Sequence, residues 1–280
     1  MKIAVISDIH GNVPALSAVL EDLAQWRPDQ VIVNGDVINR GPYSLAGLQL
    51  LRAHLPDAHY LTGNHESFVL HCAGEMLEPG HPKYDLRQFA QWTVQQLGAE
   101  ILEEIRHWPD HLDMPELEGG SSFHITHGSR LGNRQGISAR TREEDLPEKL
   151  GDYRELFVCS HTHKAMQRQY NGMLIVNTGS VGQPMDDDPR AAYGRFIYSN
   201  KRWQGEIRRV VYDKAQAERD FHQSGFLEAG GPLVQLIYRE HQNNRIYVGA
   251  MMAQYYDAIT NGEISLADAV QRYLAQLGES

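Results

Sequence analysis

Residues 1–12 of the chain read MKIAVISDIHGN. The run KIAVIS is short, rich in Val and Ile, and followed directly by polar and Gly residues, which predicts a buried β-strand that ends at a turn. Asp8 and His10 come immediately after this strand. Residues two apart in an extended segment point to the same side, so the strand is expected to present a carboxylate and an imidazole together.

The same pattern recurs along the chain. Five further apolar runs are each followed by Gly-containing polar segments and are predicted to be strands: QVIVN (30–34), HYL (59–61), SSFHIT (121–126), LFVC (156–159) and MLIVN (173–177). Helical spacing of apolar residues in 13–26 and 43–55 predicts two helices between the first three strands. Strands alternating with helices indicate an α/β architecture with parallel strands.

The remaining chain suggests how the domain is organised. Residues 67–120 break the strand–helix alternation and are predicted to form a helical cap insertion. Segments 195–200 and 206–213 are expected to pair as antiparallel strands that turn at 201–205. We therefore expect a main domain over residues 1–213 and a helical C-terminal extension over 214–280, with Ser265 as a helix N-cap. The extension is compatible with a dimer contact or with a lid over one face.

Composition limits the classes of function. The chain has 280 residues, 41% hydrophobic and 22% charged, with a formal net charge of −10. This charge opposes broad binding to nucleic acid, but it allows a small anionic substrate if bound divalent cations reverse the local sign. Only Cys72 and Cys159 are present and no apolar run is long enough to span a bilayer, so we expect a cytoplasmic protein without membrane contact.

The chemistry-bearing residues cluster just after the predicted strands. In open α/β sheets the carboxyl ends of the strands are where ligands bind. Carboxylate, imidazole and amide oxygen form a mixed ligand set without thiolates, which suits Mn, Fe, Zn or a similar divalent metal. One such Asp–His pair would carry little weight, but the pattern repeats at five stations. The candidates are Asp8, His10, Asp36, Asn64, His65, His127, His161 and His163.

Taken in order, these motifs resemble those of the calcineurin-like metallophosphoesterases. The matching segments are Asp8-x-His10, GDVINRG (35–41), GNHE (63–66), THG (126–128) and SHTH (160–163). The similarity covers about residues 1–200, including NTGSVGQPMDDDPRAAY (177–193), which is similar to the closing segment of bacterial phosphodiesterases. The resemblance implies an α/β fold in which two sheets form a sandwich flanked by helices.

The resemblance also implies roles for the residues. One metal would be bound by Asp8, His10, Asp36 and His163, with Asp36 bridging to a second metal bound by Asn64, His127 and His161. A hydroxide between the metals would attack phosphorus. His65 would contact the scissile phosphate or protonate the leaving group, and Arg40 would clamp the phosphate.

Two departures from the family pattern bear on the substrate. Asn39 stands where the phosphoprotein phosphatase branch has Asp, which argues against a protein phosphatase, and Ser160 replaces the usual Gly of G-H-T-H. The expected activity is hydrolysis of a phosphodiester or a dinucleoside polyphosphate. Protein phosphatase or nuclease activity, or a non-catalytic binding module, are the alternatives.

Some residues near the motifs have less specific explanations. Arg130, Arg134, Arg140 and Arg142 follow His127 in one basic loop, which is either simply solvated or faces a phosphate. The nine histidines outside the motifs are expected to be surface or packing residues.

Overall fold

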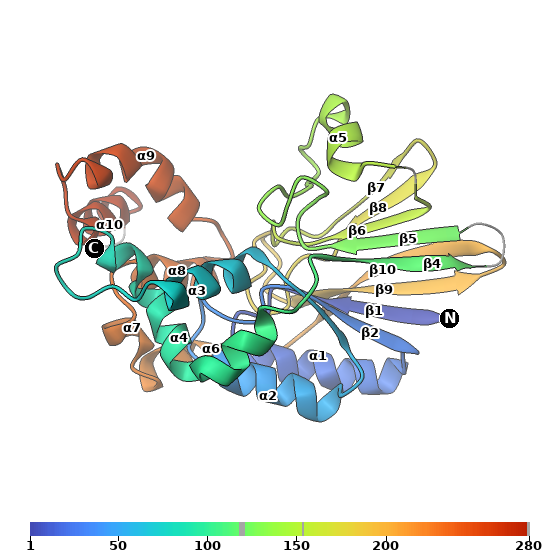
Figure 1. Cartoon of the computed structure of the whole chain (residues 1–280), viewed down its shortest axis with the longest axis horizontal. Helices are drawn as coiled ribbons and strands as arrows, with labels where there is room; N and C mark the ends of the chain where they lie inside the picture. The colour runs from blue at the N-terminus through green and yellow to red at the C-terminus, as the bar shows by residue number, and fades with distance from the viewer. Residues whose placement is uncertain (118–120, 153, 279–280) are drawn as a thin grey trace.

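A computed structural model describes residues 1–117, 121–152 and 154–278. Two five-stranded sheets lie on one side of the molecule, and most of the helices cover the other side and one face (Figure 1). The carboxyl ends of the central strands point toward the helical side, where the connecting loops meet. The fold therefore directs the predicted site residues toward the junction between sheets and helices.

The first sheet has the strand order β10-β9-β1-β2-β3. Its strands β1 (Lys2–Ile6), β2 (Gln30–Asn34) and β3 (His59–Leu61) are parallel, and helices α1 (Val13–Trp26) and α2 (Ser44–His54) connect them. Strands β9 (Ala191–Ser199) and β10 (Arg202–Val210) extend this sheet in antiparallel fashion. These elements confirm the predicted βαβαβ start.

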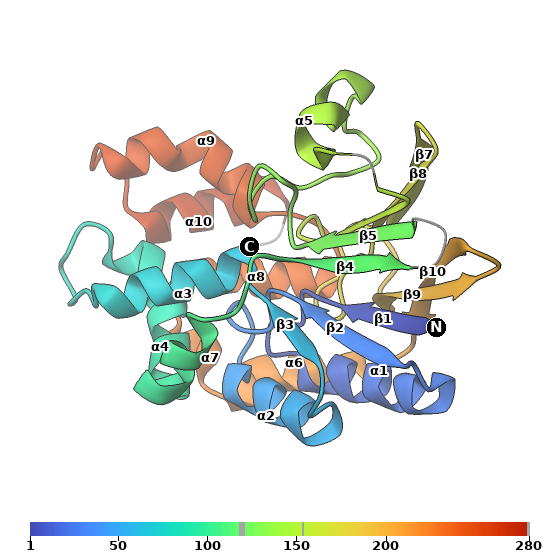
Figure 2. The same ribbon diagram turned by 45° about the vertical axis from the view of Figure 1, so that its right-hand side comes forward.

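The second sheet has the order β4-β5-β6-β8-β7. Strands β5 (Ser121–Thr126), β6 (Leu156–Cys159) and β8 (Met173–Asn177) are parallel, whereas β4 (His111–Leu117) and β7 (Met166–Tyr170) are antiparallel edge strands. Asn171 and Gly172 both have positive φ and join β7 to β8. Figure 2 shows the two sheets face to face, with α1 and α2 below the first sheet.

Apolar side chains fill the space between the sheets. Phe123 of β5 packs against Phe196 of β9 and Trp203 of β10, with ring centroids 5.4 and 4.8 Å apart. A second apolar layer holds α1 against the first sheet, and α5 (Leu146–Leu150) covers the outer face of the second sheet. The predicted α/β sandwich flanked by helices is therefore confirmed.

The helical insertion is shorter than predicted. It comprises α3 (Asn64–Gly74) and α4 (Tyr84–Ile105), and residues 111–117 then form strand β4. Leu112 and Met114 pack on the core between the sheets while His111 and Asp113 are exposed, so this segment follows the two-residue period of a strand. Residues 118–120, where the insertion was predicted to end, lie outside the described residues.

The predicted turn between β9 and β10 is also wrong. The two strands are longer than expected, and the chain reverses at Asn200 and Lys201, whose φ angles are 51° and 60°. Two consecutive residues with positive φ give the type I′ turn that matches the twist of a hairpin. Trp203, placed in the turn by the sequence, instead lies in β10 with its ring in the core.

The C-terminal helices pack on the insertion. They are α6 (Lys214–Gln223), α7 (Phe226–Ala229), α8 (Leu233–Asn243), α9 (Val248–Thr260) and α10 (Leu266–Gln276). The predicted cap is confirmed, because the Ser265 hydroxyl accepts a hydrogen bond from the Asp268 amide at 3.0 Å.

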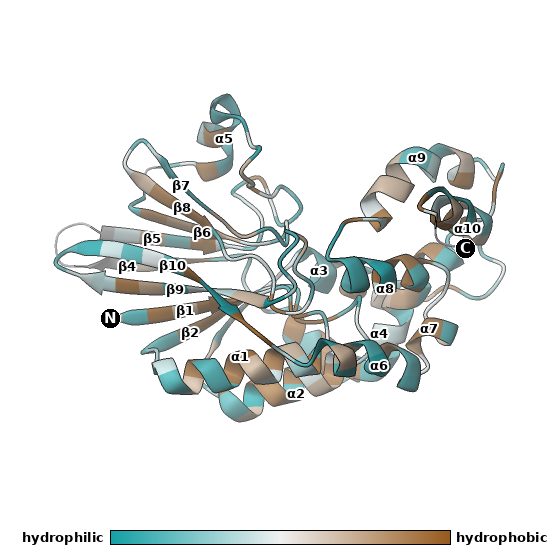
Figure 3. Cartoon of the chain, turned by 180° about the vertical axis from the view of Figure 1, so that it is seen from behind, coloured by the Kyte–Doolittle hydropathy of each residue, from teal (hydrophilic) through white to brown (hydrophobic). Residues whose placement is uncertain are grey.

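Apolar residues of these helices share one core with Phe89 of α4, whereas the outer surface of α6 is mainly hydrophilic (Figure 3). Within the described residues, no helix combines the length and apolar character needed to cross a membrane.

Candidate metal centre

The predicted ligands meet at the carboxyl ends of five strands. Asp8 and His10 follow β1, and Asp36 follows β2. Asn64 is the first residue of α3, directly after β3. His127 follows β5, and His161 and His163 follow β6. Because parallel strands end at a common edge, segments more than 150 residues apart in sequence supply one site.

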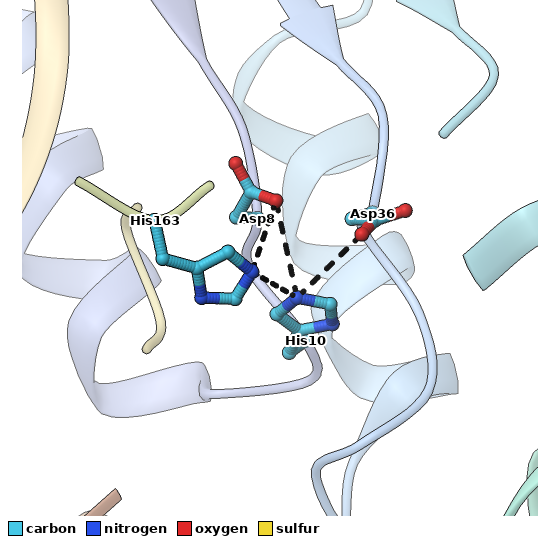
Figure 4. A group of neighbouring side chains, drawn as sticks. All are labelled: Asp8, His10, Asp36 and His163. Atoms are coloured by element: carbon cyan, nitrogen blue, oxygen red, sulfur yellow. Dashed lines mark hydrogen bonds and ion pairs between the residues drawn. The ribbon is translucent and has the colours of Figure 1, made fainter. Parts of the chain in front are cut away.

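Four of these residues form a compact cluster. Ligand atoms of Asp8, His10, Asp36 and His163 all lie within 4.8 Å of one another, and all four residues are buried. Figure 4 shows their side chains pointing toward a common centre. His163 Nε2 is 3.2 Å from Asp8 Oδ1, and His10 Nε2 is 3.8 Å from Asp36 Oδ2. Two carboxylates and two imidazoles are a suitable set for one divalent metal.

A second ligand set adjoins the first through Asp36. His127 Nε2 is 3.3 Å from Asp36 Oδ2 and 3.1 Å from Asn64 Oδ1. His161 Nδ1 is 2.6 Å from the same Asn64 oxygen. The structure thus brings all seven predicted ligands together in two sets, and Asp36 lies between them.

Hydrogen bonds outside the cluster orient three of the imidazoles. The Nδ1 atoms of His10, His127 and His163 lie 3.2, 2.8 and 2.6 Å from backbone carbonyl oxygens, to which only a protonated nitrogen can donate. When one of these rings is neutral, this bonding leaves Nε2 as the atom that faces the cluster with a lone pair. His10 Nε2 and His163 Nε2 are 3.2 Å apart, and two facing lone pairs at this distance repel each other unless a proton or a metal ion binds them.

The buried carboxylates also demand positive charge. Asp8 and Asp36 are 0% and 1% exposed, and Asp8 Oδ1 has no hydrogen-bond partner within the described residues. Burial alone would lower the pKa of His127, but the Asp36 and Asp8 carboxylates reverse this and raise it to about 10. A proton on His127 therefore supplies charge that a bound cation can replace. An orphaned carboxylate oxygen and facing imidazole nitrogens fit divalent metal ions.

Backbone strain is concentrated at the same residues. Asp8, His10, Asp36, His161 and His163 all have φ between 50° and 67°, in the left-handed region that non-glycine residues rarely adopt. Each such residue costs about 1–3 kcal/mol, and strain of this kind persists where a site requires it. Five strained residues in one cluster therefore support a functional role.

Glu66 organises the loop that carries Asp36, a role that the sequence analysis did not assign to it. Its carboxylate is fully buried and accepts hydrogen bonds from the backbone amides of Asp36 at 2.7 Å, Val37 at 2.8 Å and Gly63 at 2.9 Å. Burial, assisted by the Asp36 carboxylate, raises the pKa of Glu66 to about 7. Glu three residues after Gly63, at the start of a helix, is a capping-box position, and this signal could have identified it.

Ser160, the other departure from the family pattern, joins a polar network below the ligands. Its hydroxyl lies 2.8 Å from the Asn34 side-chain amide, which donates to it, and 3.0 Å from the Thr178 hydroxyl. The Ser7 hydroxyl continues this network and donates to Asp8 Oδ2 at 2.9 Å. The hydroxyl of Ser160 therefore supports the segments that hold Asp8 and removes no ligand.

His65 lies beside the first ligand set and lines the cleft. Its ring meets that of His10 edge-on at 5.0 Å. The Asn39 amide lies 2.9 Å from His65 Nδ1, and the Thr93 hydroxyl donates to the Asn39 oxygen at 3.3 Å. This arrangement directs the Asn39 NH₂ group to Nδ1, so the proton of the neutral ring is on Nε2. Burial lowers the pKa of His65 to about 3, against the opposing attraction of Asp36.

Arg40 is tied to the C-terminal helices. Its Nε donates to Gln183 at 2.9 Å, and Nη2 forms an ion pair with Glu240 of α8. Glu240 is 1% exposed, and its other oxygen accepts the amides of Tyr247 at 2.7 Å and Val248 at 2.8 Å at the start of α9. Glu240 lies 200 residues from Arg40 in sequence, and no local motif marks it.

An open cleft of about 630 Å³ reaches both ligand sets, at Asp36 and His163 of the first and at Asn64 and His161 of the second. Asp36, His65 and His161 lie along it, and Ile246 and Val248 of the C-terminal extension form part of the opposite wall. Arg134, Gly136 and Ser138 of the loop before α5 also line the cleft. This loop and the segment that leads into α9 can be located in Figure 1. The cleft is large enough for a nucleotide-sized ligand.

The chain is similar to known proteins over most of its length. Residues 1–200 match the calcineurin-like phosphoesterase superfamily domain. Phosphodiesterase YfcE of Escherichia coli K12 is 28% identical over 199 residues, which cover 69% of this chain and 86% of that protein. A symmetrical bis(5'-nucleosyl)-tetraphosphatase of Dechloromonas aromatica is 30% identical over 156 residues, which cover 55% of this chain and 53% of that protein.

The fold comparison extends further along the chain. The crystal structure of a metallophosphoesterase from Sphaerobacter thermophilus superimposes with a TM-score of 0.68 at 25% identity, covering 87% of this chain and 100% of that chain. The chain belongs to the calcineurin-like phosphoesterase superfamily. It is a hydrolase of phosphoric esters, and the Asp and His cluster provides a site for divalent metal.

Proposed function

We propose that the protein is a dinuclear metal-dependent phosphoesterase that hydrolyses a phosphodiester or a dinucleoside polyphosphate. The observation that carries this proposal is the pair of ligand sets joined by Asp36. Asp8, His10 and His163 lie on one side of Asp36, and Asn64, His127 and His161 on the other. Two divalent ions of the Mn, Fe or Zn type, when bound, would neutralise the substrate's charge and activate a water at neutral pH.

The protein's own contribution is to position the phosphate and to offer it hydrogen-bond donors. His65 carries its proton on Nε2 at the edge of the cleft, where it can donate a hydrogen bond to a phosphoryl oxygen or to the leaving oxygen. Arg40 lines the same cleft, and its Nη1 group is left for a phosphoryl oxygen after Nε and Nη2 have bound Gln183 and Glu240. Phosphoryl transfer needs little from a protein beyond such positioning and charge neutralisation.

The relatives support small phosphorylated substrates. One relative is named a phosphodiesterase and another a symmetrical bis(5'-nucleosyl)-tetraphosphatase. Asn39 keeps an amide against His65 Nδ1 where the protein phosphatase branch has a carboxylate, which favours these substrates over a phosphoprotein. Cys72 and Cys159 are buried free thiols, which supports a reducing, cytoplasmic location.

The experiment compares hydrolysis of bis(p-nitrophenyl) phosphate with hydrolysis of p-nitrophenyl phosphate. The protein is stripped with a chelator and refilled separately with Mn²⁺, Zn²⁺, Fe²⁺ or Mg²⁺. We expect metal to restore cleavage of the diester, and His65→Ala to lower kcat by about 10²–10⁴-fold while metal content stays the same. His59→Ala, which removes an exposed histidine of β3, is the matched control. Diester turnover equal in His65→Ala and His59→Ala would contradict the role of His65.

A further inference from the structure

Two basic side chains of the cleft lie close to residues of the metal centre. Arg134 and Lys164 both line it, and neither side chain makes a hydrogen bond or an ion pair within the part of the chain that the structure describes. Other arginines nearby are paired: Arg142 with Glu144 and Asp145, and Arg168 with Glu143. In a chain with a net charge of −10, two unpaired cations beside one site mark a place for an anion.

The loop that carries Arg134 is fixed between two parts of the metal centre. On one side, Asn133 donates hydrogen bonds to the Gly63 carbonyl at 3.2 Å and the Ser67 hydroxyl at 2.9 Å, next to the ligand Asn64. On the other side, Gly136 lies against the ligand His161, where an added Cβ would come within 3.0 Å of the imidazole. Arg134 is therefore held beside the second ligand set.

Further contacts make this loop a built structure. The Lys149 ammonium donates to the Gln135 and Gly136 carbonyls at 3.3 and 3.1 Å. Lys164 directly follows the ligand His163, and its amide hydrogen bonds to the Thr162 hydroxyl at 3.4 Å. The backbone positions of both cations are thus set by the segments that carry metal ligands.

The rest of the cleft has a different character. The charge of Arg40 is already compensated by Glu240, so Arg40 adds little net attraction for an anion. Apart from Glu240, which pairs with Arg40, the C-terminal extension contributes apolar residues and Gly249 to the lining: Ile246, 45% exposed, and Val248. Met185, which precedes β9, adds a further apolar side chain. The cleft therefore combines a cationic side with an apolar side, and the proposed catalytic residues are between them.

We propose that Arg134 and Lys164 form a subsite for a second phosphoryl group, so that the preferred substrates are organic esters of di- or polyphosphate. This inference rests on the proposed function and decides between its two substrate classes. The scissile phosphorus lies at the metal centre, the adjoining phosphoryl group binds Arg134 and Lys164, and the organic group lies against Ile246 and Val248. A diester with a single phosphate leaves both cations unused.

The test measures binding and so does not depend on turnover. Calorimetry gives the affinities of AMP and of adenosine 5′-(α,β-methylene)diphosphate, with Mn²⁺-loaded protein and again without metal. We expect the wild-type protein to bind the diphosphate about tenfold or more tightly than AMP, as one or two charge-assisted hydrogen bonds imply. In Arg134→Ala/Lys164→Ala, and in Arg134→Gln/Lys164→Gln, this preference should fall to about twofold or less.

Arg140→Ala is the matched control, because Arg140 is an exposed arginine of the same loop that does not line the cleft. It should keep the wild-type preference. If the double variants prefer the diphosphate over AMP as strongly as Arg140→Ala and the wild-type protein do, the subsite is refuted.

The diester assay separates the two proposals. If the wild-type protein cleaves bis(p-nitrophenyl) phosphate with metal while the preference is insensitive to Arg134 and Lys164, the subsite is refuted and the phosphoesterase stands. If the preference depends on both cations but no ester is cleaved with any metal, the subsite is supported and the proposed catalysis fails.

Discussion

Replacing Glu240 by Ala is expected to destabilise the protein by about 3–5 kcal/mol. The substitution leaves Arg40, whose side chain is only 13% exposed, without its carboxylate partner, and breaking a buried ion pair by removing one partner costs about this much. It also removes the acceptor of the Tyr247 and Val248 amides at the start of α9. Glu240→Gln keeps an acceptor oxygen and the volume but loses the charge, so its cost should be smaller, about 1.5–3 kcal/mol.

The assay is urea unfolding followed by circular dichroism, with the free energy of unfolding extrapolated to water. Glu228→Ala, which removes an exposed carboxylate of α7, is the control and should change this free energy by less than about 0.5 kcal/mol. Arg40→Met/Glu240→Leu removes both charges and should be more stable than Glu240→Ala. A loss below about 1 kcal/mol in Glu240→Ala, or a double variant that is the least stable, would refute the buried pair.

Three further predictions concern the metal centre, the helical core and pH. Gly136→Ala adds a Cβ within 3.0 Å of the His161 ring and should displace this imidazole from the metal centre. In a titration with chelator, the more weakly bound of two Mn²⁺ ions should therefore be released at about tenfold lower chelator concentration than in the wild-type protein. Phe226→Ala, at a fully buried ring, should cost about 3–5 kcal/mol in urea unfolding, and a loss below 1 kcal/mol would mean that α7 does not pack in this core. Burial lowers the pKa of His241 to about 4 from 6.5, so the unfolded chain takes up this proton first as pH falls. The contribution of His241 to the free energy of unfolding, about 3 kcal/mol, is therefore present above pH 6.5 and is lost as the pH falls from 6.5 to 4. His241→Gln should flatten this decline.

The strands and the clustering of the candidate ligands could be predicted because their signals are local. QVIVN and LFVC coincide with β2 and β6, since short runs of Val, Ile, Leu and Phe between turn residues have few alternatives in a buried sheet. The ligands follow these strands within a few residues. Once the strands are known to be parallel, the geometry of the sheet brings Asp8, Asp36 and His163 to one edge.

The edges of the sheets were harder to predict. β4 and β7 are edge strands with polar residues on one face, so their sequences HLDMPEL and MQRQY lack a long apolar run. Asn171-Gly172 is a strong hairpin signal, and it could have identified β7 and β8 as a pair. Trp203 was misplaced because a Trp beside Lys and Arg resembles an exposed turn, whereas the space between the sheets determines its position.

Residues that support the site from a distance could not be predicted. Glu240 reaches Arg40 from α8 of the C-terminal extension, and nothing in its local sequence indicates this contact. Among the four arginines of the basic loop, Arg134 alone lines the metal cleft, and Arg130 lies at a separate cavity beside His124. Asn133 and Gly136 hold the Arg134 segment beside the metal cleft, and both do so through tertiary contacts.

The most direct test of the account is the number of Mn²⁺ ions that the chelator-stripped protein binds at equilibrium. The shared position of Asp36 predicts two ions per chain in the wild-type protein, one in His161→Ala, and weak or no binding in Asp36→Ala. A wild-type protein that binds a single ion, or none, at saturating Mn²⁺ would contradict the dinuclear centre.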